Sequence, residues 1–332
     1  MGFLDRRSFI QLAGASMASA AFPLTAQPNP EIPRLGLVVK VSKGGTAEET
    51  IKHVHDLGIP TCQIFFDELS MSKTAPLMAA MKKYDVQVSA VSEHNPGPRV
   101  FDFYQGPPTI GIIPPKYRKE RIDALKLAAD FAKTCGISAI HTHLGFIPED
   151  PNDPIYPVAI AATKEVAQHC KDQGVMLLCE TGEETPITML RMIQDVGTGN
   201  VFVNLDTANL ILYGKGNPVD AMDVFGSLVR GTHMKDGLFP TNPHTLGDEV
   251  AIGTGKVDFP AVFRKLKEVN YTRTITIERE ISGPQQIADI KQSMTFLQNL
   301  IDKTFRDPHG NVPSAHEKAL QKRRKAVPPP ER

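Results

Sequence analysis

The stretch QGVMLLCETGEETP, residues 173–186, decides the fold class because it joins the end of one helix to a strand and then to the next helix. Gly174 suits the left-handed residue with which helices often end. The apolar run at 175–180 is typical of a parallel strand that is buried on both faces. Thr185 followed by Pro186 places a capping residue before a proline at the first helical position. The stretch therefore predicts one βα unit.

The same alternation repeats on both sides of this stretch. Capping signals recur at the Thr46 to Glu49 box, at Asn217-Pro218 and at Asp258. Buried strands are predicted at residues 35–41, 61–66, 86–91, 139–143, 175–180, 201–206, 231–234 and 274–278. Eight consecutive βα units predict one α/β domain, a single (βα)8 TIM barrel over residues 34–303. A doubly wound open sheet is disfavoured because the turn at 42–46 lacks the glycine spacing of a dinucleotide-binding loop.

The two ends of the chain are predicted to lie outside the barrel. Arg6 and Arg7 precede an apolar run at 12–22 that is rich in small residues and too short to span a bilayer stably. Residues 1–27 therefore resemble a twin-arginine signal peptide, which implies the twin-arginine export machinery as a partner and the periplasm as the location. Residues 304–332, which are basic and contain prolines, are interpreted as a solvated tail.

Composition excludes some function classes. Lys and Arg number 37, as do Asp and Glu, so the formal net charge is zero. A nucleic-acid partner is not expected, because binding to phosphates usually requires a basic surplus. The four cysteines form no C-x-x-C pair and are interpreted as small buried side chains. No stretch is apolar and long enough to predict a stable membrane span.

Side chains of the kind that bind metals end four successive predicted strands: Glu180, Asp206, His233 and Glu278. A carboxylate placed after an apolar strand is costly to desolvate unless it is paired or coordinated. The carboxyl ends of barrel strands meet at one mouth, where active sites of this fold are built. Three carboxylates and one imidazole suit Mn²⁺, with Mg²⁺, Co²⁺ or Fe²⁺ as alternatives. The sequence therefore predicts one divalent cation at this mouth. Taken singly, each of these residues could instead be a strand-end polar group that is hydrogen-bonded to a neighbouring loop.

The residues around these ligands resemble a known family. The motifs are Glu180-Thr181-Gly182, the NLDTAN run at 204–209, His233-Met234-Lys235-Asp236 and Ile277-Glu278. They are similar to those of the xylose-isomerase-like TIM-barrel superfamily, the sugar phosphate isomerase/epimerase group, over about residues 34–300. The resemblance implies a metal-dependent isomerase or epimerase that acts on a keto-sugar through an enediolate. It also implies that Glu180 and Glu278 are both metal ligands and acid/base groups.

Two positions depart from the ketose epimerases of that group. Many of them have a histidine where this chain has Asn209 and an arginine where it has Phe239, and both residues normally touch substrate oxygens. A lyase or hydratase acting on 3-keto-glycosides by the same enolate chemistry therefore stays open as an alternative.

Four further residues are expected to contact the substrate: His94, His143, Asn209 and Lys235. A solvent-facing lysine and satisfied strand-end histidines are the alternatives for Lys235, His94 and His143. His141 is interpreted as a core residue, and Glu183 as a residue of the pocket rim that does not bind metal. The long connections at 92–115 and 235–257 are expected to cover the mouth of the barrel.

More distant functions are weaker alternatives. The endonuclease branch of the group needs an Asp-x-His motif downstream of His233, and the stretch 236–258 contains His244 but no such motif. A non-catalytic sugar-binding protein fits poorly with an intact set of four ligands. A homo-oligomer is left open by analogy with other barrels of the group.

Overall fold

The computed structural model describes residues 32–94 and 96–306. The predicted signal peptide at 1–27 and residues 307–332 of the predicted tail lie outside the described residues. Thr304 is buried in the last helical turn, and Phe305 packs against the core. Residues 304–306, which were assigned to the tail, therefore belong to the last described helical turn.

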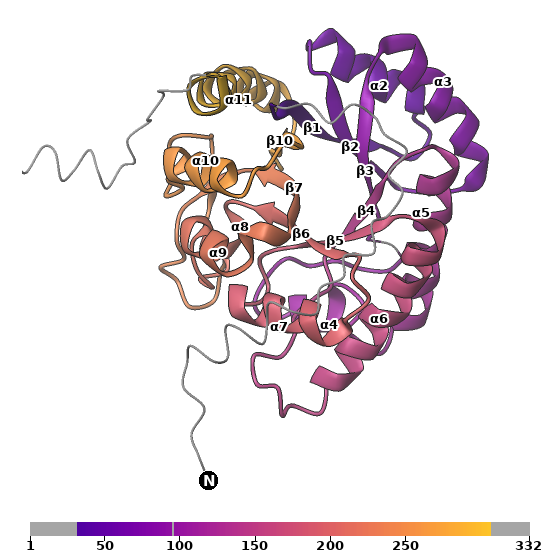
Figure 1. Ribbon diagram of the computed structural model, residues 1–332, viewed down its shortest axis with the longest axis vertical. Helices are drawn as coiled ribbons and strands as arrows, with labels where there is room; N and C mark the ends of the chain where they lie inside the picture. The colour runs from indigo at the N-terminus through magenta and orange to yellow at the C-terminus, as the bar shows by residue number, and fades with distance from the viewer. Residues whose placement is uncertain (1–31, 95, 307–332) are drawn as a thin grey trace, which may run out of the picture.

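Within the described residues, eight parallel strands close into a barrel in the order β1-β10-β7-β6-β5-β4-β3-β2 (Figure 1). The strands are β1 (Arg34–Val41), β2 (Thr61–Phe66), β3 (Gln87–Ser92), β4 (Ala139–Thr142), β5 (Met176–Glu180), β6 (Val201–Asp206), β7 (Val229–Met234) and β10 (Thr274–Ile277). The predicted single barrel is confirmed, and the observed strand limits differ from the predicted ones by two residues at most.

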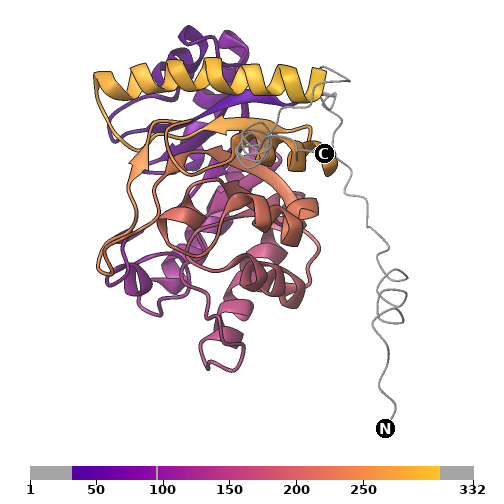
Figure 2. The same ribbon diagram turned by 90° about the vertical axis from the view of Figure 1, so that its left-hand side faces the viewer.

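Helices surround the barrel, and α11 lies along its outside against β1 and β10 (Figures 1 and 2). The longer helices are α2 (Ala47–Asp56), α3 (Thr74–Tyr84), α5 (Arg118–Thr134), α6 (Tyr156–Gln173), α7 (Pro186–Val196), α9 (Pro218–Phe225), α10 (Phe259–Glu268) and α11 (Pro284–Ile301). Short helical turns are η1 (Met71–Lys73), α4 (Gly106–Thr109), α8 (Asn209–Leu212), η2 (Gly226–Leu228) and η3 (Asp302–Arg306). In the described part of the chain, no helix is both long and apolar enough to cross a membrane.

Most of the predicted helix starts are confirmed. Thr46 forms its capping box, and the side chains of Asn217 and Asp258 accept hydrogen bonds from the first turns of α9 and α10. Thr185 differs, because its side chain accepts no hydrogen bond from the first turn of α7, while its hydroxyl donates to Glu149 Oε2 at 2.7 Å. The helix α7 therefore begins on its proline without a side-chain cap.

The barrel interior near the mouth is polar, whereas the outer faces of the strands pack against the helices. All four cysteines are buried and free, as predicted. Gly231 on β7 has a steric role, because a Cβ there would lie 2.3 Å from Asn204 Oδ1. The glycine therefore leaves room for an amide that supports the site described below.

Two long connections border the mouth. The one after β7 contains a pair of antiparallel strands that the sequence did not predict, β8 (Asp236–Gly237) and β9 (Glu249–Val250). Asp236 organises this loop, since its Oδ2 accepts hydrogen bonds from the backbone of Gly253 and Gly255 at 2.9 and 2.8 Å. The connection after β3 contacts it through Tyr104, whose ring stacks on His244 at 5.8 Å. The two loops thus meet beside the mouth.

Candidate metal centre and active site

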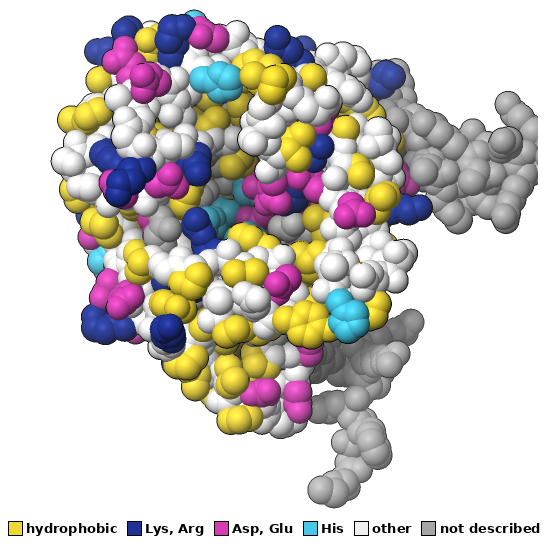
Figure 3. Space-filling view, turned by 180° about the vertical axis from the view of Figure 1, so that it is seen from behind, with side chains coloured by type: hydrophobic (Ala, Val, Ile, Leu, Met, Phe, Trp, Pro, Cys, Tyr) yellow, Lys and Arg dark blue, Asp and Glu magenta, His cyan; other side chains and the backbone are white. Residues whose placement is uncertain are grey.

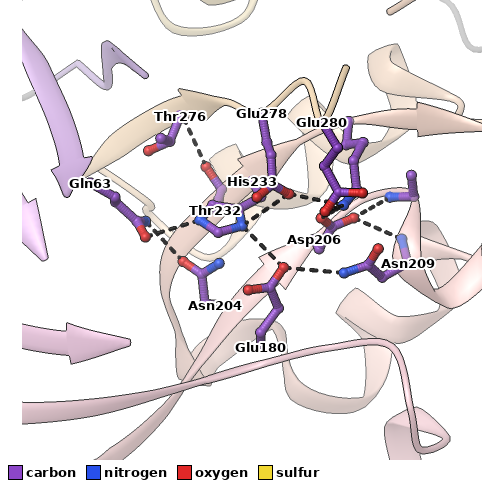
Figure 4. Close-up of polar contacts among 12 residues, drawn as sticks. Gln63, Glu180, Asn204, Asp206, Asn209, Thr232, His233, Thr276, Glu278 and Glu280 are labelled. Atoms are coloured by element: carbon purple, nitrogen blue, oxygen red, sulfur yellow. Dashed lines mark hydrogen bonds and ion pairs between the residues drawn. The ribbon is translucent and has the colours of Figure 1, made fainter. Parts of the chain in front are cut away.

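The four predicted ligands converge at the carboxyl end of the barrel. Glu180 and Asp206 are the last residues of β5 and β6, His233 lies one residue before the end of β7, and Glu278 follows β10. One donor atom from each lies within 4.8 Å of the other three. The close-up shows their side chains pointing toward a common centre (Figure 4). The structure therefore brings together the set that the sequence singled out.

His233 is oriented by a chain of amides beneath the centre. Gln63 Nε2 donates to Asn204 Oδ1 at 3.1 Å, so Gln63 Oε1 is turned toward the imidazole. His233 Nε2 lies 2.9 Å from that oxygen and must donate to it (Figure 4). Nδ1 is then the free nitrogen, and it faces Glu180 Oε1 at 3.1 Å. A histidine fixed in this way is typical of a metal ligand, whose second nitrogen is anchored by a hydrogen bond.

Asp206 is held at the start of a short helical turn. Its Oδ1 accepts hydrogen bonds from the backbone N–H groups of Ala208 and Asn209, both at 2.7 Å. Its Oδ2 accepts no hydrogen bond from the described residues and faces Lys235 Nζ at 3.1 Å. One oxygen is therefore used to orient the side chain, while the other is left for a cation.

Glu180 is surrounded by nitrogen atoms. Asn209 Nδ2 donates to its Oε1 at 3.1 Å, and His141 Nε2 contacts its Oε2. His143 Nε2 lies 3.4 Å from Oε2. Burial raises the pKa of Glu180, but His233, His143 and His141 outweigh burial and hold this pKa well below its usual value. The carboxylate is thus kept ionised in a buried position.

Lys235 lies behind Glu278 and Asp206 and is itself 1% exposed. Its Nζ is 2.9 Å from Glu278 Oε2 and 3.3 Å from Glu280 Oε1. Burial raises the pKa of Glu278, but Lys235 and His233 more than offset it, so the pKa falls below its usual value. Lys235 is therefore a buried counter-ion of the carboxylates, and its Nζ is engaged on several sides.

The chemistry of this cluster fits a divalent cation. Burial raises the pKa of Asp206 well above its usual value, and Glu278 and Glu180 add to that rise although Lys235 opposes it. Lys235 and His233 therefore do not fully offset burial and the two neighbouring carboxylates at Asp206, and a further cation would stabilise its ionised form. Carboxylate oxygens and an imidazole nitrogen are the donors that Mn²⁺, Mg²⁺ and related ions accept.

A cavity of about 840 Å³ lies over the cluster at the mouth. Seen from behind, it is a hollow in which acidic and histidine side chains gather (Figure 3). His94 and His143 line it, as expected for substrate contacts, and so does His141, which the sequence interpretation left in the core. Asn209 and Lys235 do not line it; they contact the proposed ligands from behind.

Glu183 is buried instead of lying at the rim. Its side chain is 0% exposed, and its Oε1 lies 2.9 Å from His143 Nδ1. The preceding Gly182 permits this close packing, because a Cβ there would lie 2.9 Å from Asn209 Cβ. Glu183 thus orients the His143 ring so that Nε2 points toward Glu180.

Glu183→Gln should lower the pKa of His143 in the metal-free protein. Burial lowers this pKa, but the carboxylates of Glu183 and Glu180 raise it to about 10. The Glu183 charge is one of the two that raise the His143 pKa most. Without it, the His143 imidazolium should lose its proton at a lower pH. Imidazole NMR titration measures the shift. Glu120→Gln on α5, an exposed position, is the control; a His143 pKa equal in both variants would contradict the pairing.

Three residues of the site were missed by sequence reasoning: Gln63, Asn204 and His141. Gln63 lies within a strand, where nothing in the sequence distinguishes a polar residue that supports a ligand, and Asn204 begins the NLDTAN run but was given no role. The signal for His141 was present, since it precedes His143 by two residues and alternate strand residues share a face. Phe239, which occupies the arginine position of related epimerases, is 52% exposed and does not line the cavity.

Comparisons with known proteins agree with this architecture. A family model described as Xylose isomerase-like TIM barrel matches residues 51–300. Among solved structures, a xylose isomerase domain protein from Planctomyces limnophilus is 31% identical, with a TM-score of 0.78. That match covers 83% of this chain and 100% of the Planctomyces chain.

Two curated relatives match over part of their length. An uncharacterised protein from Methanocaldococcus jannaschii is 22% identical over 200 residues, which are 56% of this chain and 64% of that protein. An L-ribulose 3-epimerase from Methylomonas sp. is 26% identical over 175 residues, which are 50% of this chain and 54% of the epimerase. More than a third of each curated relative is therefore not covered by this chain.

Proposed function

This chain belongs to the Xylose isomerase-like TIM barrel family, and from that premise we propose that it is a divalent-metal-dependent sugar isomerase or epimerase. The substrate is a keto-sugar, and the reaction passes through an enediolate. The observation that carries the proposal is the convergence of Glu180, Asp206, His233 and Glu278 within 4.8 Å beneath an open cavity. The similarity to an L-ribulose 3-epimerase supports the same class of reaction.

In this proposal the four residues hold one cation, Mn²⁺, with Mg²⁺, Co²⁺ or Fe²⁺ as alternatives. Bound there, the cation supplies Lewis acidity that polarises a carbonyl and the adjacent hydroxyl of the sugar. Gln63 keeps His233 in the tautomer that offers Nδ1. Lys235 balances part of the negative charge of Asp206 and Glu278.

The proton transfers fall to Glu180 and Glu278. They belong to β5 and β10, which are separated in the barrel by β6 and β7, so their carboxylates approach the cavity from two sides. Each carboxylate is held ionised in the metal-free protein, so each has the unprotonated form that a general base requires. One removes the proton next to the carbonyl, and the other returns a proton to the opposite face or to the neighbouring carbon. His141 and His143 lie beside Glu180 Oε2 and stabilise the ionised form of Glu180 before it takes up the proton.

A lyase or hydratase acting on 3-keto-glycosides is the second candidate. Asn209 and Phe239 favour it, because neither supplies the substrate contact that the histidine and arginine of related ketose epimerases supply. Asn209 contacts Glu180 from behind, and Phe239 lies outside the cavity. Loss of a leaving group next to the same enolate would use the same two glutamates.

We also propose that the protein works in the periplasm after export by the twin-arginine route. Residues 1–27 support this proposal, since Arg6 and Arg7 precede the short apolar run. Phosphorylated sugars are scarce outside the cytoplasm, so an unphosphorylated sugar fits this location better. Fusion of residues 1–33 to a folded reporter tests it: the expected result is periplasmic reporter that is lost in the Arg6→Lys, Arg7→Lys variant.

The reaction class is tested by solvent exchange. Purified protein loaded with Mn²⁺ is incubated in D₂O with a panel of keto-sugars and 3-keto-glycosides. Enolate chemistry should place deuterium on the carbon next to the carbonyl of at least one compound, as read by NMR or mass spectrometry. No uptake with any compound, by folded protein that contains metal, would reject the proposed class.

A further inference from the structure

The cavity has two chemically different halves. The proposed ligands belong to β5, β6, β7 and β10, on one side of the closed ring. The other side is formed by the ends of β1, β2 and β3 and by the loop after β3. There the cavity is lined by Phe65, His94, Arg99 and Phe101, which we call the distal subsite. No proposed metal ligand belongs to it.

Among the described residues, Arg99 stacks on Phe65 and is attracted by the nearby carboxylates of Glu93 and Asp67. Its guanidinium carbon lies 5.1 Å from the centre of the Phe65 ring. Within residues 32–94 and 96–306, no hydrogen bond or ion pair to its side chain is found, although it faces the cavity. An arginine has five N–H donors in a planar fork, so these donors are free to bind oxygens of a ligand.

Aromatic rings complete the distal subsite. The Phe65 ring also packs at 5.7 Å from His94, and Phe101, 46% exposed, packs edge-on at 5.3 Å from His143. Phe65 is half-buried and Phe101 is exposed. Aromatic rings beside free donors can bind a group with apolar faces and polar edges. A sugar ring has this character, since its C–H groups form a face and its hydroxyls form an edge.

The volume of the cavity exceeds what one sugar ring fills. A cavity of about 840 Å³ is near the upper end of the ~300–1,000 Å³ range that drug-sized ligands occupy. The cavity also extends to Lys40 and Ser42 at the end of β1, which lies between β10 and the distal subsite, and to Gln286 on α11. A larger substrate therefore has a path to solvent on this side.

We propose that the distal subsite binds a second sugar ring, so that the substrate is a keto-glycoside the size of a disaccharide. The keto ring then lies over the metal half, and its neighbour packs against Phe65 and Phe101 within reach of the Arg99 donors. The placement of the keto ring rests on the function proposed above; the binding of the second ring does not.

Binding is measured first with sugars that cannot react. Isothermal titration compares glucose with maltose, cellobiose and trehalose on the full Mn²⁺-loaded protein. At least one disaccharide should bind about tenfold more tightly than glucose, which corresponds to ~1.4 kcal/mol. Phe101→Ala and Arg99→Met should remove most of this preference. Phe101 is half exposed and Arg99→Met keeps an unbranched side chain over Phe65, so both variants should fold.

Phe239→Ala is the matched control, because Phe239 is a similarly exposed aromatic residue, 52% against 46%, outside the cavity. It should leave the preference unchanged. Equal binding of glucose and all disaccharides, or an equal loss in Phe101→Ala and Phe239→Ala, would overturn the distal subsite.

Activity separates this inference from the proposed function. In D₂O, keto-disaccharides should be labelled with a higher kcat/KM than keto-monosaccharides, and Arg99→Met should reduce that ratio. Labelling of monosaccharides without any preference for disaccharides would retain the function and reject the subsite. Tight disaccharide binding that depends on Phe101, with no labelling of any compound, would retain the subsite and reject the function.

Discussion

Glu278→Gln should reduce solvent deuterium exchange into the substrate by about 10²–10⁴-fold, the usual contribution of a general acid or base. Glu278 faces the cavity with 14% of its side chain exposed, and its Oε2 is held by Lys235 at 2.9 Å. The amide of glutamine has nearly the same shape but cannot take the proton. NMR of the substrate in D₂O measures the rate, and circular dichroism confirms the fold.

Two controls make this result specific. Glu268→Gln, an exposed glutamate that pairs with Lys265 at 3.4 Å, should leave the exchange rate unchanged. The Mn²⁺ content of Glu278→Gln is measured at saturating metal, so that loss of the proton acceptor is separated from loss of the cation. Undiminished exchange in Glu278→Gln would show that another group moves the proton.

Lys235→Met should destabilise the metal-free protein by about 3–5 kcal/mol, the usual cost of breaking a buried ion pair by removing one partner. Lys235 is 1% exposed, and its Nζ lies within 3.1 Å of both Asp206 Oδ2 and Glu278 Oε2. Methionine fills similar space but leaves these carboxylates without their cation. Urea unfolding in the presence of a chelator measures the change in the free energy of unfolding.

A divalent cation should reverse much of this loss, because it supplies positive charge to the same carboxylates and binds only the folded state. Lys265→Met is the control, since Lys265 pairs with Asp223 at the surface and such pairs contribute at most about 1 kcal/mol. Equal stability of the two variants without metal would mean that Lys235 is not a counter-ion of the site.

Much of the fold was predictable because the pattern that encodes it is local and repeated. Each strand is a short apolar run, and Asn217 and Asp258 cap their helices as their positions suggest. The pair β8 and β9 was not predictable, because strands of two residues carry no periodicity. Thr185 was mispredicted as a side-chain cap, and its contact with Glu149, 36 residues away in the sequence, could not be predicted from local spacing.

The convergence of the four proposed ligands was predictable because each lies at a strand end, and the ends of barrel strands share one mouth. The side chains that orient these ligands were not predictable, because their contacts join strands that are distant in the sequence. Gln63 on β2 reaches His233 across the barrel, and no sequence pattern connects the two. Lys235 directly follows β7, two residues after His233, and alternate residues of an extended chain share a face. This explains why Lys235 lies beside the ligands; only the structure shows that it is buried under them.

Whether one cation binds at Glu180, Asp206, His233 and Glu278 is measured by calorimetric titration of the metal-free protein with Mn²⁺. We expect one site per chain in the wild type, and an affinity at least about 100-fold weaker in His233→Ala and in Asp206→Asn, since even the partners behind a ligand change affinity 10–100-fold. Folded protein that binds no Mn²⁺, Mg²⁺, Co²⁺ or Fe²⁺, or variants that bind as tightly as the wild type, would contradict this expectation.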